Sequence, residues 1–401
     1  MAANVTVDSI EPPRTSVGVL GWLKRNLFST WYNSLLTIIA AWILYVVLSQ
    51  LIVWMFTSAH WSVVTANWRL FMIGPYPPDQ ARRVHIIVAM VAGLFGVSAG
   101  VWGGTIRTFG IWLAAALATF AVLPIQTFDG EGRIWLVGDL ALVIAGYFLG
   151  RTRKGLGRYL LILWLLSFVA TIILLGGIEG NSLLPDVSTG RWGGLLLTFM
   201  LAIVSIVLSF PLGVLLALGR RSALPAVKWF SIAYIEIVRG VPLVTVLYMT
   251  QIMLPLFLPG EFRVDNVVRA MAAFTLFTAA YMAENVRGGL QAIPSGQIEA
   301  AHALGLNSPL TTLFIVLPQA LRLVIPATVG LFISLFKDTT LATIVALLEL
   351  LGVGRSVLAQ PEFLGLQTEV YLFIAAVFFV FSYVMSYASY QLERALGVGK
   401  R

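Results

Sequence analysis

The stretch Ile293–Pro326, IPSGQIEAAHALGLNSPLTTLFIVLPQALRLVIP, joins a short polar segment to a long apolar one. Pro294 and Ser295 are typical of a helix start, and we expect Ser295 to be the N-cap residue. Gly305 suits the left-handed conformation that ends many helices, and Asn307-Ser308-Pro309 then restarts the chain into the next span. The stretch therefore predicts a helix, a turn and a second helix that continues into an apolar span.

The first of these helices has two different faces. Glu299 and His302 fall away from its apolar positions and are available to solvent or to a partner. Small residues at 300, 301 and 303 would let another surface approach closely. A packed face is predicted from residues that recur at helical spacing: Ile298, Ala301 and Leu304 or Gly305. From these features alone, a docking segment and an ordinary amphipathic connector are equally open.

The composition is that of a membrane protein. Hydrophobic residues make up 59% of the chain and charged residues 11%, whereas soluble domains have roughly 45–50% and 25%. Apolar stretches of about 20 residues, enough to cross ~30 Å of hydrocarbon, recur along the chain. The sequence therefore predicts an all-α polytopic membrane protein. The ten expected spans are Thr30–Phe56, Val84–Gly104, Phe109–Ile125, Ile134–Gly150, Tyr159–Gly177, Trp192–Leu218, Val241–Leu258, Val267–Leu290, Thr311–Leu335 and Val370–Tyr390.

The basic residues orient these spans. A net charge of +8 would suggest nucleic-acid binding in a soluble protein. Membrane proteins instead gather Lys and Arg in cytoplasmic loops, because such loops resist translocation. The clusters RTRKGLGR (151–158) and GRR (219–221) carry this bias. We expect both clusters, both termini and the Pro294–Leu310 loop to face the cytoplasm.

A polar segment with Gly and Pro residues, Ile178–Arg191, separates two membrane bundles. We expect a cytoplasmic segment over 1–28, an N-terminal bundle of about five spans over 29–180, and a second bundle over 190–395 that contains the loop 294–310. No internal repeat relates the two bundles. Gly96, Gly100 and Gly104 recur every four residues in the second span, which predicts close helix contact.

The loop also carries a motif with fixed spacing. Glu299-Ala300-Ala301 is followed after three residues by Gly305 and after nine more by Ile315-x-Leu317-Pro318. This pattern resembles the EAA signature of the membrane subunits of ABC importers. In that family the loop forms a coupling helix that docks on the ATP-binding subunit. The resemblance implies an ATPase-coupling role for Glu299, Ala300, Ala301, Gly305, Leu317 and Pro318.

Further residues narrow the resemblance to permeases for polar amino acids, of the histidine, glutamine and general L-amino-acid type. It rests on Glu236-Ile-Val-Arg239-Gly240-Val-Pro242-Leu243, Tyr281-Met-Ala-Glu284-Asn-Val-Arg287-Gly288-Gly289, Gln297, Leu317-Pro318-Gln319-Ala320, Lys337-Asp338-Thr339-Thr340-Leu341 and Glu349-Leu350. Thr340 departs from the Ser that is commoner at that position. The similarity covers about residues 190–395. The extra N-terminal bundle is similar to that of the long permease in general L-amino-acid uptake systems.

The resemblance implies a fold and a function together. The fold is a type I ABC-importer core of five spans preceded by the extra bundle. The function is translocation of L-amino acids across the bacterial inner membrane by alternating access. The chain would be a transport subunit rather than an enzyme, bind no cofactor, and leave ATP and Mg to a partner ATPase dimer. The other implied partners are a second homologous permease, with which the chain would form a heterodimer, and a periplasmic solute-binding protein.

Two pairs of charged residues lie near span ends. Glu236 and Arg239, and likewise Glu284 and Arg287, are three residues apart on helical stretches, so the members of each pair can form structural ion pairs. Contact of Glu236 or Arg239 with substrate is the alternative. The Glu284–Arg287 pair precedes the coupling loop by a few turns and is expected to brace it.

A gate or substrate pathway is predicted after the ninth span. The apolar run Leu341–Leu350 is too short to cross the membrane and reads as a re-entrant segment. Lys337 and Asp338 can meet the carboxylate and ammonium of an amino acid, or pair with each other. The candidate residues are Lys337, Asp338, Thr339, Thr340 and Glu349.

Several kinds of site have no basis in this sequence. The chain contains no cysteine, and its three histidines have no metal-ligand spacing. No G-x-x-x-x-G-K-[ST] motif is present, so a P-loop for ATP phosphates is excluded. Two rival functions are a stand-alone secondary transporter or channel and a scaffold that holds partners in the membrane. A secondary transporter would predict a repeat and ionisable residues deep within spans.

Overall fold

The computed structural model describes residues 18–122, 130–257 and 264–397, and each regular element in these ranges is a helix. Contacts divide the chain into two compact units, Met1–Trp61 and Ser62–Arg401. This division differs from the predicted boundary at Ile178–Arg191. Residues 1–17 of the predicted cytoplasmic segment lie outside the described residues, as do two predicted span ends, Ile125 and Leu258.

The first unit contains α1 (Gly18–Asn26) and α2 (Trp31–Thr57). Thr30 caps α2, and its hydroxyl accepts a hydrogen bond from the Asn33 amide at 3.4 Å. No residue of α2 is buried, and its most apolar window has a mean hydropathy of 2.3. A helix that is apolar on all sides and exposed on all sides is suited to lipid.

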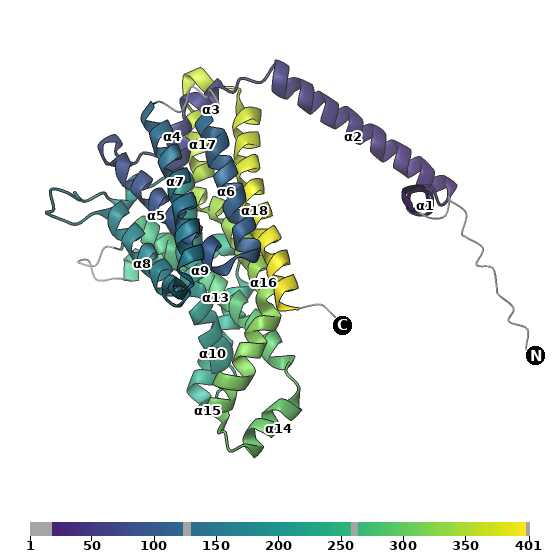
Figure 1. Ribbon diagram of the computed structural model, residues 1–401, viewed down its shortest axis with the longest axis vertical. Helices are drawn as coiled ribbons and strands as arrows, with labels where there is room; N and C mark the ends of the chain where they lie inside the picture. Colours follow the sequence, from purple (N-terminus) through teal and green to yellow (C-terminus); the bar gives the residue numbers. More distant parts are fainter. Residues whose placement is uncertain (1–17, 123–129, 258–263, 398–401) are drawn as a thin grey trace, which may run out of the picture. The chain divides into compact units, whose positions relative to one another are not determined.

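The second unit begins with short helices and a bundle of long ones. In chain order they are α3 (Ser62–Ala66), α4 (Trp68–Ile73), the 3-10 helix η1 (Pro78–Gln80), α5 (Ala81–Trp102), α6 (Gly104–Val122), α7 (Gly130–Thr152), the 3-10 helix η2 (Lys154–Leu156), α8 (Gly157–Gly176) and the 3-10 helix η3 (Thr189–Arg191). In Figure 1, α5, α6 and α7 run beside one another.

The rest of the second unit is a core built on α9 (Gly194–Gly219) and α13 (Asn266–Gln291). Between them lie α10 (Pro225–Gly240), α11 (Leu243–Tyr248), the π-helix η4 (Met249–Met253) and α12 (Leu254–Phe257). After α13 come α14 (Ser295–Ala303), α15 (Ser308–Leu310), the π-helix η5 (Thr311–Val316), α16 (Leu317–Asp338), the 3-10 helix η6 (Thr339–Val345), α17 (Leu350–Leu358), the 3-10 helix η7 (Pro361–Phe363) and α18 (Gln367–Leu396). Figure 1 places α14 and α15 at one end of this unit and α3 and α17 at the other.

The prediction of a polytopic all-α protein is confirmed. Among the described residues, nine helical runs are long and apolar enough to cross a membrane. A tenth is reached if α10 and α11–α12, bent by 108°, count as one span. The predicted seventh span, Val241–Leu258, is therefore only one limb of a bent pair. The bend falls at Pro242, which has no amide hydrogen and lies in extended backbone.

The predicted ninth span was too short. The helical run that contains it extends from Ser308 to Val345, beyond the predicted Thr311–Leu335 at both ends. Asn307 extends its start, because the side-chain oxygen accepts a hydrogen bond from the Leu310 amide at 3.0 Å. Its end is prolonged by η6, which follows α16 without a break.

Glycines allow α5 and α7 to touch backbone to backbone. A β-carbon on Gly96 or Gly100 would lie closer than 3.0 Å to a carbonyl oxygen of α7, a separation that real β-carbons do not reach. The same holds for Gly146 and Gly150 of α7 against carbonyl oxygens of α5. The predicted contact is present at Gly96 and Gly100. Gly104 was wrongly included, because it begins α6 and has open space around it.

The core helices α9 and α13 pack in a similar way. A β-carbon on Gly213 would lie too close to the Met282 side chain, so only glycine fits. Ser205 of α9 donates a hydrogen bond to the Met271 carbonyl of α13 at 3.3 Å. This contact fixes α9 against α13, and the segments at each end of the core attach to these two helices.

The α5–α7 contact can be tested with a matched pair of substitutions. Gly96→Ala should destabilise the protein by about 1–3 kcal/mol, because the added methyl overpacks a backbone contact. Gly93→Ala on the same helix should leave stability unchanged or slightly higher, because its β-carbon lies 4.0 Å from Leu142 Cβ and alanine favours helix. Thermal unfolding in detergent measures both. Equal melting temperatures for the two variants would contradict the close contact.

Candidate functional site

The segment after α13 positions a short exposed helix, α14. Ile293 is buried and anchors the turn, and Pro294 is the N-cap residue. Ser295 is therefore the first helical residue rather than the predicted N-cap, and no side chain caps this end. The proline ring fixes φ at the N-cap, and because residues 295–297 are exposed, water can satisfy the amides of the first turn.

Most of α14 is exposed. Glu299 and Ala300 lie at the surface, and Ala301 is the one buried residue of the helix. Leu304 was predicted on the packed face, but its side chain is 84% exposed. The helix ends at Ala303, so Leu304 already belongs to the turn and points away from the core. A protruding leucine beside small residues is a surface that can bury apolar area against a partner.

Gly305 ends the helix as predicted. Its φ is +87°, in the left-handed region that favours glycine. The Gly305 amide donates to the His302 carbonyl at 2.9 Å, and the Leu306 amide donates to the Ala301 carbonyl at 3.1 Å. Nothing lies within 4 Å of a β-carbon built at Gly305. Conformation, rather than lack of space, therefore requires glycine here.

The chain returns to the core through η5 and α16. Leu317 and Pro318 begin α16, which continues the π-helix η5 without a break, and Pro318 has no amide hydrogen to donate back to that turn. Leu317 packs against the buried cluster of the core, whereas Pro318 is exposed. Gln319 of α16 donates to the Gln297 side chain of α14 at 2.6 Å. The short helix is thus tied to α13 by the chain and to α16 by a hydrogen bond.

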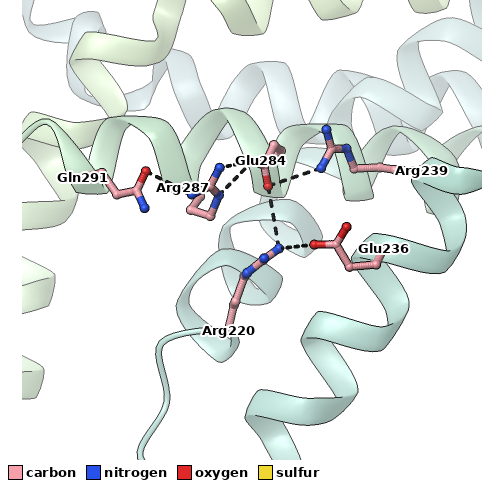
Figure 2. Close-up of polar contacts among 6 residues, drawn as sticks. All are labelled: Arg220, Glu236, Arg239, Glu284, Arg287 and Gln291. Carbon is pink, nitrogen blue, oxygen red and sulfur yellow. Dashed lines mark hydrogen bonds and ion pairs between the residues drawn. The ribbon is translucent and has the colours of Figure 1, made fainter.

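A network of charged residues lies just before this segment. Figure 2 shows Glu284 of α13 facing the guanidinium groups of three arginines. Arg287 donates two hydrogen bonds to Glu284 Oε1, one of them from Nε at 2.8 Å. Glu284 Oε2 lies 3.5 Å from Arg239 Nη1 and 3.8 Å from Arg220 Nη1. The Glu284 side chain is 22% exposed, so solvent screens these charges only in part.

The predicted pairing of Glu236 with Arg239 is wrong. Glu236 pairs with Arg220 at the end of α9, 2.8 Å from Nη1, and Arg239 turns to Glu284 instead. The sequence did not single out Arg220, because it lies far from both carboxylates along the chain. The predicted Glu284–Arg287 pair is present. The five residues join α9, α10 and α13 at one point (Figure 2).

The predicted re-entrant segment is more helical than expected. Lys337 and Asp338 form the last turn of α16, and η6 continues the helix. The hydroxyls of Thr339 and Thr340 donate to the carbonyls of Phe336 and Lys337 at 2.7 and 2.8 Å. No ion pair joins Lys337 to Asp338 in the described part of the chain. Successive helical residues point about 100° apart, which accounts for this.

Glu349 is a buried helix cap. Its side chain is fully buried, and its carboxylate accepts hydrogen bonds from the Leu351 and Gly352 amides, both at 2.8 Å, and from the Thr343 hydroxyl. Burial raises the pKa of the Glu349 carboxyl from 4.5 to about 7, although these hydrogen bonds lower it in part. The cap holds α17 on the end of η6. Glu349 therefore stabilises the predicted gate segment from inside and is not exposed to a substrate.

A cavity of about 310 Å³ lies beside Asp338. Thr278 and Tyr281 of α13 and Ser334 of α16 contribute its other polar groups, and the remaining lining is apolar. Tyr281 also lies under the Arg239 guanidinium, 5.6 Å from the ring centre. The charged network and the cavity thus share one tyrosine. Of the residues predicted for a substrate pathway, Asp338 alone is among those that line this cavity.

Comparisons with known proteins agree on one family. Residues 209–398 match the family of binding-protein-dependent transport system inner membrane components. The chain is 37% identical over 408 residues to the inner membrane amino-acid ABC transporter permease protein YhdY of Escherichia coli strain K12, with 97% of each chain covered. It is 36% identical over 418 residues to the glutamate/glutamine/aspartate/asparagine transport system permease protein BztC of Rhodobacter capsulatus, with 96% of this chain and 95% of the relative covered.

A solved structure described as an amino acid ABC transporter with histidines matches half of the chain. The identity is 27% and the TM-score 0.46, with 50% of this chain and 92% of that chain covered. YhdY and BztC are matched along nearly their whole length, so they share the N-terminal bundle as well as the core.

The charged network can be tested through stability. Glu284→Gln should lower the free energy of unfolding by about 1–3 kcal/mol, because three guanidinium groups lose their shared carboxylate in a partly screened site. Glu236→Gln is the matched control, since its side chain is 54% exposed and pairs with Arg220 alone. We expect a change of about 0–1 kcal/mol there. Thermal unfolding in detergent separates the two, and an equal loss would show that Glu284 is not the centre of the network.

Proposed function

The chain belongs to the family of amino-acid permeases of ABC transporters, and from this premise we propose that it translocates L-amino acids across the inner membrane by alternating access. A separate ATPase drives the movement by pushing and pulling on α14. The single observation that carries this proposal is the form of α14, an exposed helix fastened at both ends to the core. The stand-alone transporter is not favoured, because the family consists of ABC transporter subunits.

The exposed face of α14 is the proposed docking surface. Glu299, Ala300 and Leu304 present a carboxylate, a small side chain and an apolar side chain to a partner. Ala301 packs inward and Gly305 closes the helix, so these residues set its position rather than contact the partner. Leu317 and Pro318 carry the movement into α16. The sequence motif and the exposure of this helix support the same assignment.

Movement of α14 would pass to the spans through rigid connections. α14 follows α13 after three residues, and Gln297 is bonded to Gln319 of α16. The network around Glu284 fixes α9 and α10 to the same part of α13. A force on α14 would therefore move four helices together, as a rocking mechanism requires.

The cavity beside Asp338 is the proposed place of substrate. An α-amino acid carries an ammonium group, and the Asp338 carboxylate is a suitable counter-charge. Thr278 and Tyr281 offer hydroxyl groups to the substrate carboxylate or side chain. Because Arg239 lies on the Tyr281 ring, movement of the charged network would reshape this cavity. Lys337 is exposed and does not line it.

The remaining parts of the system lie on other chains. We place ATP and Mg on an ATPase dimer, because this sequence has no P-loop motif. A second homologous permease would complete the pore as a heterodimer, and a periplasmic solute-binding protein would deliver the amino acid. Both termini and α14 would face the cytoplasm, on the side where the basic clusters 151–158 and 219–221 lie.

The coupling role can be tested at two residues of this segment. Glu299→Lys and Gly305→Val should each abolish ATP-dependent amino-acid uptake while insertion into the membrane is retained. The first reverses a charge on the docking face, and the second places a branched side chain at φ +87°, which costs about 1–2 kcal/mol and distorts the turn. Gly365→Val is the control, because Gly365 has a similar φ of +91° and open space around it but lies outside α14, between η7 and α18. Uptake into proteoliposomes that contain the ATPase measures all three. Normal uptake by the first two variants would contradict the assignment.

The substrate site can be tested separately from coupling. Asp338→Asn should raise the amino-acid concentration for half-maximal uptake by about tenfold to a hundredfold, as expected for loss of a charged hydrogen bond. ATP hydrolysis by the associated ATPase should persist. Lys337→Gln, the neighbouring change outside the cavity, should leave uptake unaltered. Similar losses for both variants would place the substrate elsewhere.

A further inference from the structure

The short helices α3 and α4 lie between two predicted spans and were not predicted from the sequence. They precede the region that matches the family model, and the sequence indicates no function for them. Yet Val63 of α3, Phe71 of α4 and Tyr76 in the loop after α4 have no exposed surface. α4 contacts α17 and α3 contacts α18, at the end of the unit opposite α14 (Figure 1). Such complete burial indicates that the segment is part of the core.

The loop after α4 meets the core backbone to backbone. A β-carbon on Gly74 would lie closer than 3.0 Å to three backbone atoms of Gly193, just before α9. A β-carbon on Gly193 would in turn lie 2.9 Å from Gly74 Cα and 3.0 Å from the Leu348 carbonyl oxygen. A β-carbon on Gly194 would likewise lie closer than 3.0 Å to the carbonyl oxygen of Phe71. Contacts of this kind leave no side chain between the segments that could rearrange and let them slide.

The start of α9, where these glycines lie, is also hydrogen-bonded to the start of α17. The Gly194 amide donates to the Leu348 carbonyl at 2.8 Å, and the Leu350 amide donates to the Thr198 hydroxyl at 3.1 Å. These bonds join the start of α9 to the start of α17, where the Glu349 cap lies. The loop at Gly74 therefore packs on the junction that holds the predicted gate segment in place.

Aromatic side chains extend this contact to α18 and α8. The Phe71 ring lies 5.1 Å from the Phe373 ring of α18 in an edge-to-face arrangement, and the Trp68 ring lies 6.0 Å from it. The Tyr76 hydroxyl donates to the Leu175 carbonyl of α8 at 3.0 Å. The residues Trp68–Tyr76 thus contact α8, α9, α17 and α18.

We infer that Trp68–Tyr76 is a positioning segment for transport, which makes α4, the start of α9 and α17 move as one rigid body during the transport cycle. This inference rests on the proposed function. It assigns a role to part of the N-terminal region: the segment fixes the end of the gate that lies opposite the coupling helix.

Two glycines with positive φ angles provide a matched test. Gly74 and Gly180 have φ values of +62° and +76°, but only Gly74 has neighbours within 4 Å. Gly74→Ala should lower ATP-dependent uptake by about tenfold, because it separates the loop from Gly193 as well as straining the backbone. Gly180→Ala carries the strain alone and should retain uptake. Gly193→Ala should reproduce the loss from the other side of the contact.

ATP hydrolysis in the same proteoliposomes distinguishes this inference from the function on which it rests. Loss of uptake with hydrolysis retained in Gly74→Ala supports a positioning role at the gate. Absence of ATP-dependent uptake in the unaltered protein would instead overturn the proposed function. Equal uptake by Gly74→Ala and Gly180→Ala would overturn the inference.

A distance measurement tests the rigid body even if Gly74→Ala fails to fold. The chain has no cysteine, so spin labels can be attached at Thr65→Cys on α3 and Leu364→Cys between α17 and α18, both exposed. The distance between the labels should be the same with and without ATP trapped on the ATPase. A change in that distance during the cycle would contradict the inference.

Discussion

Helices in a bilayer gain little by burying apolar side chains against each other, because lipid tails are just as apolar. Close approach of backbones, with the dispersion and polar contacts it allows, must supply much of the attraction. In the second unit this approach occurs at several places, among them α5 with α7, α9 with α13, α13 with α16, and the loop after α4 with the start of α9. Each place depends on glycine, and a single added methyl would separate the segments. The positions of both the coupling helix and the gate follow from these contacts.

The charged network around Glu284 also holds helices together, close to the coupling helix. Glu284 lies on α13 three turns before α14 begins, and its arginine partners come from α9, α10 and α13. The network is only partly buried, so the cost of removing its charges from water is moderate. Through Arg239 and Tyr281 it also reaches the cavity beside Asp338. One continuous set of contacts therefore runs from the surface of α14 to the proposed place of substrate.

Much of this could be predicted from the sequence where local spacing decides the structure. The span positions, the left-handed turn at Gly305 and the pairing of Glu284 with Arg287 depend on residues a few positions apart. Arg220 was missed because it lies sixteen residues before Glu236 and meets it only when α9 packs against α10. The burial of Glu349 was missed for a similar reason, since its environment is formed by η6 and α9 together. The spacing of motifs identifies a family, but contacts between distant helices require the folded chain.

The central claim is that a separate ATPase acts on the exposed face of α14. Because the native chain has no cysteine, a single introduced thiol reports on one position. Leu304→Cys places a thiol on this face, and Leu183→Cys places one at a site that is 88% exposed in the loop before the core. Maleimide labelling should be blocked at position 304 by saturating ATPase and remain unchanged at position 183. Labelling at position 304 that is unaffected by the bound ATPase would contradict the account.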